Sequence, residues 1–214
     1  MKTQVARPNV RKAALQMALG GVVGLVSTLG LSVLLPSVTD ALTPSSAALL
    51  GTGLVYALMG LFVGLGVGIP KLGANILSVG DAEDLVDQRT MLSGSAVSCL
   101  ALGSSMVLLA LSGRGGLISA SLAAGLLAAS VVLSIGISIA QWRLYDELMR
   151  GISLDASAIM AGAATMVILP WATLAHLGRT GPIDPLGLIA VLAISMLFGS
   201  FVAAGRRGLL LPPQ

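Results

Sequence analysis

The side chains that could do acid–base or nucleophilic chemistry are few in this sequence. Asp155 and His176 fall in one apolar segment, and Asp184 follows a short loop. At 1.5 Å per residue in a helix, Asp155 and His176 would lie roughly 30 Å apart, so they cannot form an acid–base pair. Asp184 could orient His176, but a Ser–His hydrolase also needs a strained nucleophile turn, and no Gly-x-Ser-x-Gly sequence is present.

Metal chemistry has equally little support. The only histidine is His176, and the only cysteine, Cys99, lies inside an apolar run where a packing role is expected. Three aspartates, Asp81, Asp84 and Asp87, would share one face of a helix, and converging carboxylates can hold a hard cation. A solvated helix is the reading we favour, with contact to a cytoplasmic partner as the other use. We therefore expect no catalytic residue, no metal ligand and no cofactor, and we do not expect an enzyme.

The composition indicates a membrane protein. The chain has 214 residues, of which 56% are hydrophobic and 10% charged, whereas soluble domains carry about 25% charged residues. About 20 apolar residues cross a bilayer as a helix. Six segments meet this requirement, at residues 13–35, 45–69, 91–112, 116–141, 152–177 and 185–205. The expected fold is all-α, a polytopic bundle of about six transmembrane helices forming a single integral membrane domain over residues 1–214.

The cationic residues predict the orientation of this bundle. Cations concentrate in cytoplasmic loops. Ten of the 12 Lys and Arg residues fall on one side of the predicted membrane, before the first span, after the last or in alternate loops. They are Lys2, Arg7, Arg11, Lys12, Lys71, Arg89, Arg143, Arg150, Arg206 and Arg207. Only Arg114 and Arg179 fall on the other side. We therefore expect a bacterial inner-membrane protein with both termini in the cytoplasm; a cleaved first span would instead leave five spans and an outer N-terminus. Nothing in the sequence resembles a nucleic-acid-binding face.

The six spans can be grouped as three two-helix hairpins. The outer loops at 113–118 and 178–183 have similar sequences, and so do the hairpin starts at 92–96 and 154–158. Similarity at a fixed period is typical of structural repeats. The sequence thus suggests a parallel repeat of a two-helix unit.

Small residues recur at every fourth position in the spans. In lipid, helices associate through close backbone approach, which small residues permit. The first two spans provide the glycine candidates for helix packing, Gly20, Gly24, Gly60, Gly64 and Gly68. The last two spans show the same spacing at Ser157, Ala161 and Thr165 and at Ser195, Gly199 and Ala203. We expect most such faces to pack within the bundle, with dimerisation or a partner helix as the alternative.

The inner loop at residues 143–150 carries four charges. As a helix it would pair Arg143 with Glu147, and Asp146 with Arg150, at i,i+4 spacing. Together with Asp84 and Asp87, these four residues are the candidates for contact with a cytoplasmic partner. Trp142 and Tyr145 would anchor the adjoining span at the membrane interface.

Residues 146–156 read Asp-Glu-Leu-Met-Arg-Gly-Ile-Ser-Leu-Asp-Ala. This stretch resembles one shared by small bacterial inner-membrane proteins, Asp-Glu-hydrophobic-x-Arg followed by Leu-Asp/Glu-Ala before a membrane span. The similarity extends over residues 143–205. It implies a membrane location and transfers no substrate-binding or catalytic residue.

Two functions are compatible with this pattern. The first is an integral membrane protein that acts by helix association, as an accessory, assembly or stabilising subunit of a membrane complex or as a small homo-oligomer. Its partners would be the lipid bilayer and another membrane protein or a second copy, with no nucleic acid. The alternative is a small transporter or channel for a neutral or hydrophobic solute, because Gly-rich spans and repeats also suit alternating access. An intramembrane enzyme ranks third.

Overall fold

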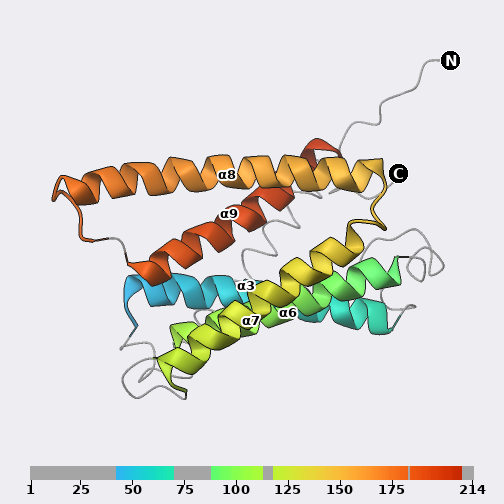
Figure 1. Ribbon diagram of the computed structural model, residues 1–214, viewed down its shortest axis with the longest axis horizontal. Helices are drawn as coiled ribbons and strands as arrows, with labels where there is room; N and C mark the ends of the chain where they lie inside the picture. Colours follow the sequence, from blue (N-terminus) through green and yellow to red (C-terminus); the bar gives the residue numbers. More distant parts are fainter. Residues whose placement is uncertain (1–41, 70–87, 113–117, 183, 209–214) are drawn as a thin grey trace, which may run out of the picture.

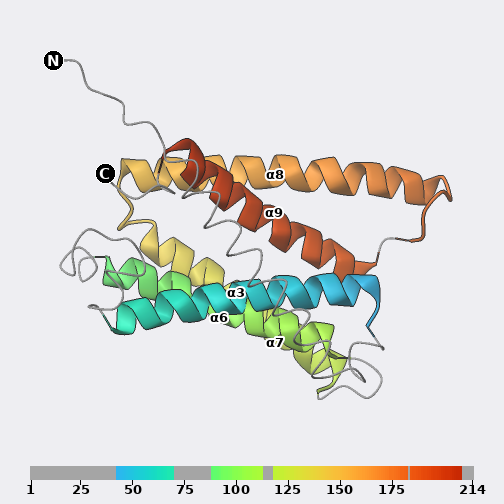
Figure 2. The same cartoon turned by 180° about the vertical axis from the view of Figure 1, so that it is seen from behind.

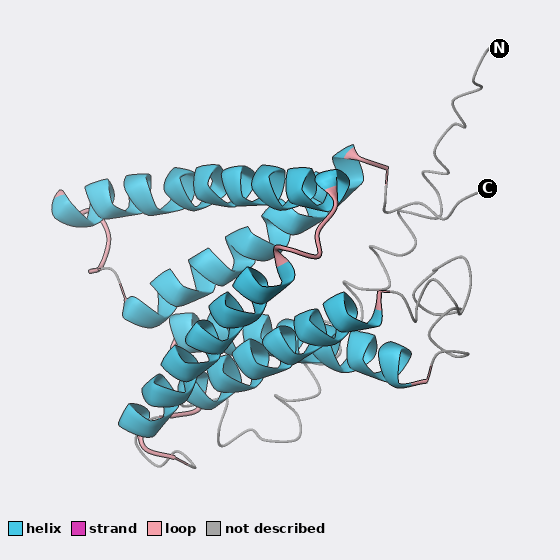
Figure 3. Ribbon diagram, turned by 45° about the vertical axis from the view of Figure 1, so that its right-hand side comes forward, coloured by secondary structure: helices cyan, strands magenta, loops and turns pink. Residues whose placement is uncertain are grey.

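The computed structural model describes residues 42–69, 88–112, 118–182 and 184–208. Every regular element in these ranges is a helix (Figure 3), so the expected all-α class is confirmed for them. The helices are α3 (Pro44–Gly68), α6 (Arg89–Ala110), α7 (Ala120–Gln141), α8 (Glu147–His176) and α9 (Pro185–Arg206). The predicted first span at 13–35 lies outside the described residues, as do Gly20, Gly24, Asp84 and Asp87.

All five helices are long and apolar enough to cross a membrane. They correspond to the last five predicted spans, and two of their starts differ from the prediction by more than two residues. Helix α7 begins at Ala120 rather than at 116. Helix α8 begins at Glu147 rather than at 152 and has 30 residues, about 45 Å, so it exceeds a hydrocarbon core of roughly 30 Å.

Side-chain caps explain where four of the helices begin. Thr43, Ser119, Asp146 and Asp184 each accept a hydrogen bond from a backbone amide in the first turn of the helix that follows. Such caps satisfy amides that have no partner within the helix. Helix α8 ends before Gly178, whose φ of 66° belongs to the left-handed region that glycine adopts without strain.

The inner loop differs from the prediction. Residues 142–146 form a turn, and helix begins again only at Glu147. Asp146 caps this new helix, since its Oδ1 accepts from the Met149 amide at 2.7 Å. The i,i+4 pairs expected for a continuous helix, Arg143 with Glu147 and Asp146 with Arg150, are therefore wrong: the single ion pair among the described residues joins Arg207 and Asp155.

The helices pack in the order α8–α9–α3–α6–α7, with α8 and α7 at opposite margins (Figures 1 and 2). Helices α6 and α7 form one neighbouring pair and α8 and α9 another, and α3 joins the two by contacting both α6 and α9. The core gathers around this junction, at Leu49, Leu50, Tyr56, Met106, Leu109, Ala110, Ala123 and Ala190.

Charged residues divide between the two ends of this bundle. Helices α3 and α9 end where α6 and α8 begin, at the right of Figure 1, and α7 ends there too. The described arginines at this end are Arg89, Arg143, Arg150, Arg206 and Arg207. At the opposite end the only described arginine is Arg179, in the loop between α8 and α9.

Candidate functional site

The closest helix contact joins α3 to α6 through glycines. A Cβ atom added at Gly53 would lie 2.9 Å from the carbonyl oxygen of Gly103 and 2.9 Å from the amide nitrogen of Val107. One added at Gly103 would meet the Ala57 amide and would lie 2.7 Å from the Gly53 carbonyl oxygen. These distances are too short for a real Cβ atom. The two backbones touch only because neither Gly53 nor Gly103 has a side chain.

The three candidate glycines of α3 occupy different positions. Gly60 belongs to the same contact, because an added Cβ would lie 2.6 Å from the Leu100 amide nitrogen. Gly64 is looser, at 3.7 Å from the Ala96 Cβ, and Gly68 has nothing within 4 Å among the described neighbours. Gly53, which completes the contact, is seven positions before Gly60, two helical turns along the same face. The fourfold spacing used for the prediction therefore missed Gly53.

The contact between α8 and α9 depends on another glycine. An added Cβ on Gly199 would lie 2.5 Å from the Ala156 carbonyl oxygen and 3.0 Å from the Met160 amide nitrogen. Ser195 and Ala203, one turn to either side of Gly199, are buried as well. Helix α9 thus turns its small residues inward, against α8 and α3.

Helix α8 exposes a group of small residues in its middle turns. The only buried residue among its 30 is Ala164. The small residues that share an exposed face are Ser157, Ala158, Ala161, Gly162 and Thr165, which we call the α8 small-residue face. An added Cβ on Gly162 meets nothing within 4 Å. The predicted triplet Ser157–Ala161–Thr165 therefore packs against no described helix.

Hydroxyl groups along α8 are bonded within the helix itself. Thr165 Oγ1 donates to the Ala161 carbonyl oxygen at 2.8 Å, and Ser157 Oγ donates to the Ser153 carbonyl oxygen at 2.8 Å. Such back-bonding satisfies the hydroxyl hydrogen without any partner outside the helix. The face consequently presents small side chains whose donors are already used.

Two buried polar side chains connect different helices. The Tyr56 hydroxyl, midway along α3, donates to the Ala193 carbonyl oxygen of α9 at 3.0 Å. Gln141, the last residue of α7, donates from Nε2 to the carbonyl oxygens of Thr90 and Met91 at 3.0 and 3.1 Å. Neither hydrogen-bonded connection was predicted from the sequence. The only sequence signal for them is a tyrosine and a glutamine in apolar surroundings.

The turn between α7 and α8 places an arginine on an aromatic ring. The Arg150 Cζ lies 5.9 Å from the centroid of the Trp142 ring, and Arg150 Nη2 donates to the Trp142 carbonyl oxygen at 3.4 Å. The Tyr145 ring lies 6.0 Å from that of Trp142. The other predicted contact residues, Arg143 and Glu147, are exposed at the same turn.

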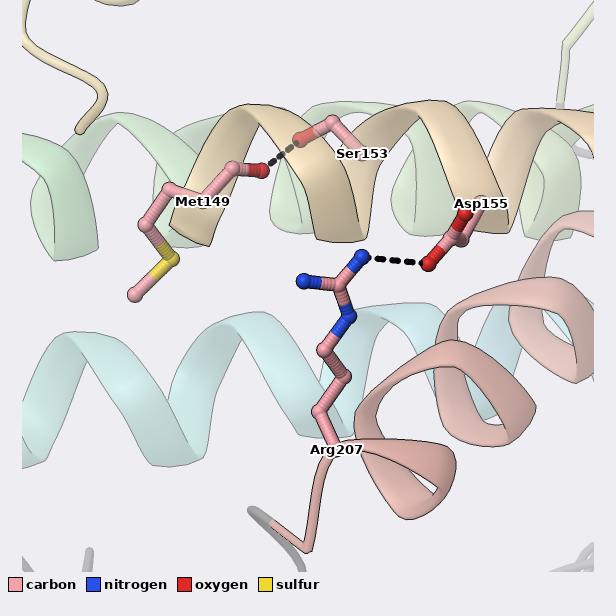
Figure 4. A network of polar contacts seen from close by, with 4 residues as sticks. All are labelled: Met149, Ser153, Asp155 and Arg207. Carbon is pink, nitrogen blue, oxygen red and sulfur yellow. Dashed lines mark hydrogen bonds and ion pairs between the residues drawn. The ribbon is translucent and has the colours of Figure 1, made fainter. Parts of the chain in front are cut away.

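An ion pair joins α8 to the end of α9 (Figure 4). Arg207 Nη2 donates to Asp155 Oδ2 at 2.7 Å. Gly151 makes room for the guanidinium, since an added Cβ there would lie 2.9 Å from Arg207 Nη2. Both partners are partly solvent-accessible. This pair links α8 to the C-terminal end of α9.

The residues considered for chemistry remain apart. His176 is exposed at the last position of α8, Asp184 caps α9, and Asp155 is paired with Arg207. Cys99 is half-buried in α6. Within the described ranges, no group of three His, Cys, Asp or Glu side chains is arranged to hold a metal ion.

The fold and these contacts define a class: an α-helical bundle whose five described helices are all of membrane-spanning length and apolarity. The chain matches no protein-family model, no curated protein and no solved structure. The resemblance of residues 146–156 to small bacterial membrane proteins therefore stays a prediction.

Proposed function

We propose that this chain is an integral membrane protein that acts by helix association, as an accessory, assembly or stabilising subunit of a membrane complex or as a small homo-oligomer. The observation that carries the proposal is the α8 small-residue face. The closest approaches between helix backbones inside the bundle occur at glycines, as at Gly53, Gly103 and Gly199. Helix α8 offers the same kind of surface with no described helix against it.

Lipid contact alone does not account for small residues on this face. Helix association in a bilayer depends on close van der Waals packing, which small residues improve and lipid-facing positions do not require. The remainder of the exposed surface of α8 carries large apolar side chains, such as Leu154, Met166 and Leu169. A run of small residues on such a surface lets the backbone of a second helix approach closely.

The charge distribution supports an inner-membrane location with the arginine-rich end in the cytoplasm. Five described arginines lie at that end and one at the other, the asymmetry that orients polytopic proteins. With a sixth span at residues 13–35, both termini would lie on the cytoplasmic side. Arg143, Asp146, Glu147 and Arg150 would then face the cytoplasm as well.

The alternative of a transporter or channel for a neutral solute has less support. Such a protein needs polar groups that are free to bind a solute within the membrane. The hydroxyls of Ser130, Ser134, Thr165 and Thr173 each donate to the carbonyl oxygen four residues earlier. Their donors are thus already used.

The proposal is tested by enlarging the α8 small-residue face. We expect the protein, extracted gently in a neutral detergent at its native level, to carry a stoichiometric companion or a second copy in native mass analysis. Ala161→Leu and Gly162→Leu should lower the fraction of the complex at least fivefold, because a large side chain keeps the partner backbone at a distance. Both positions are exposed, and a Cβ added at Gly162 meets nothing within 4 Å among the described residues, so we expect the fold to tolerate the larger side chains.

The matched control is Met166→Leu, which changes an 81% exposed side chain of the same helix without altering its size class. This variant should keep its companion. A wild-type protein that is monomeric and without a companion would contradict the proposal. The proposal would also be contradicted if Ala161→Leu and Gly162→Leu left the fraction of the complex as high as Met166→Leu does.

A further inference from the structure

We infer that the turn between α7 and α8 binds the headgroup of an anionic phospholipid, with Arg150 as the phosphate-binding residue and Trp142 as its support. This inference concerns a different surface from the α8 small-residue face and does not depend on a protein partner. It starts from the stacking of the Arg150 guanidinium over the Trp142 ring, at 5.9 Å from the ring centroid. Tyr145 extends the aromatic surface, with its ring 6.0 Å from that of Trp142.

The lengths of the two helices place this turn at the depth of the headgroups. Helix α7 has 22 residues, about 33 Å, which covers a hydrocarbon core of roughly 30 Å and leaves Trp142 at its boundary. Helix α8 has 30 residues, and a core of that thickness takes up only about 20 of them. Counted from His176, the first turns of α8, including Arg150, therefore lie beyond the core in the headgroup layer.

No carboxylate in the described part of the chain is paired with Arg150, which leaves its guanidinium available for an external anion. The two nearest carboxylates in the sequence are Glu147 and Asp146, and neither forms an ion pair with Arg150. Asp146 is engaged as the cap of α8 through its bond to the Met149 amide at 2.7 Å. The described residues contain one ion pair, and it uses Arg207 and Asp155. The N–H groups of a guanidinium lie in its plane, so stacking on an aromatic ring leaves them available. Two parallel N–H groups of this planar fork match two phosphate oxygens. Among the described residues, the Arg150 side chain makes one hydrogen bond, which it donates to the Trp142 carbonyl oxygen at 3.4 Å.

The charge of the surrounding surface favours an anionic lipid over a zwitterionic one. The described residues at this end of the bundle include five arginines against three carboxylates, Asp146, Glu147 and Asp155. At the other end, Arg179 is balanced by Asp184. Basic surfaces next to membrane helices attract anionic headgroups, whereas the cation of a zwitterionic headgroup opposes the attraction.

The two tryptophans of the chain allow a direct test. Trp171→Phe leaves Trp142 as the single tryptophan, and its emission is followed in neutral-detergent micelles while phosphatidylglycerol or phosphatidylcholine is added to the full chain. We expect a saturable change with phosphatidylglycerol and none with phosphatidylcholine. In the reverse variant, Trp142→Phe, the emission of Trp171 should not respond, because Trp171 lies near the opposite end of α8.

Variants of the arginine identify the binding residue. Arg150→Gln should raise the phosphatidylglycerol concentration at half-saturation about fivefold, the effect of one cation near an anionic membrane surface. Arg150→Lys should raise it at least twofold, since it keeps the charge but loses the planar fork. Arg179→Gln, at the opposite end, should leave the half-saturation point unchanged and serves as the matched control.

Several results would overturn the inference. They are an equal response to phosphatidylcholine, an equal decrease in affinity with Arg179→Gln, and saturation by inorganic phosphate at the same concentration as by lipid. If Arg150→Gln loses helical circular dichroism, Arg150→Lys decides the question, and an unchanged half-saturation point in that variant counts against Arg150 as the phosphate-binding residue.

Discussion

Replacing Gly103 by alanine tests the glycine contact between α3 and α6 in the most direct way. The added Cβ would meet the Ala57 amide and lie 2.7 Å from the Gly53 carbonyl oxygen. The carbonyl alone requires a separation of roughly 0.7 Å to reach an ordinary contact of about 3.4 Å, and the nearer amide requires more. Overpacking of this kind typically costs about 1–3 kcal/mol. Alanine also stabilises a helix interior relative to glycine by about 0.5–1 kcal/mol. We therefore expect a net loss of about 0–2.5 kcal/mol, centred on roughly 1 kcal/mol, in the free energy of unfolding.

The assay is reversible unfolding in mixed micelles, in which the denaturing detergent is increased and helical circular dichroism is recorded. The control is Gly136→Ala, which lies within α7 and has nothing within 4 Å of an added Cβ. It includes the gain in helix propensity without the steric cost, so it should be neutral or stabilising. If Gly103→Ala is as stable as Gly136→Ala, the backbones of α3 and α6 do not depend on glycine at this point.

Three further changes test the polar connections by the same unfolding assay. Tyr56→Phe removes the hydrogen bond to the Ala193 carbonyl and should cost about 0.5–1.5 kcal/mol; an unchanged midpoint would mean that the bond contributes nothing. Gln141→Leu removes two hydrogen bonds to α6 and should loosen α7, at a cost of about 1–3 kcal/mol in the free energy of unfolding. If the α7 amides are equally protected from hydrogen exchange in the wild type and the variant, α7 is not held by Gln141. In a double-mutant cycle, the half-exposed ion pair of Arg207 and Asp155 should show a coupling free energy of about 1 kcal/mol or less. A coupling of several kcal/mol would mean that the pair does not behave as a solvent-screened one.

The location of the helices could be predicted from the sequence because membrane spans are determined by local composition. A run of about 20 apolar residues must satisfy its backbone internally and therefore forms a helix wherever it is inserted. Helix α3 accordingly lies within one residue of the predicted span at 45–69. The start of α8 was missed by five residues because the capping bond of Asp146 extends the helix into a charged segment that hydropathy does not recognise.

The contacts between helices could not be predicted in the same way. Spacing shows which residues share a face, but which face meets which neighbour depends on the rotation of each helix and on the order in which the helices pack. Gly60 and Gly68 lie on one face by spacing, yet only Gly60 contacts α6. The Tyr56 hydroxyl reaches a carbonyl 137 residues away, a pairing that no local pattern contains. Conversely, the spacing of Ser157 and Ala161 suggested packing, and no described helix covers that face.

Cross-linking from the α8 small-residue face in native membranes tests the central claim most directly. A Cys99→Ala background removes the only cysteine, and a single cysteine is then placed at Ala161 on the exposed face or at Ala164, the one buried residue of α8. With a short bifunctional maleimide, we predict that the cysteine at position 161 forms a discrete adduct with another membrane protein or a second copy, and that the one at position 164 does not. A reactive cysteine at position 161 that is modified by maleimide in the membrane yet yields no adduct would show that lipid covers this face, which contradicts the account.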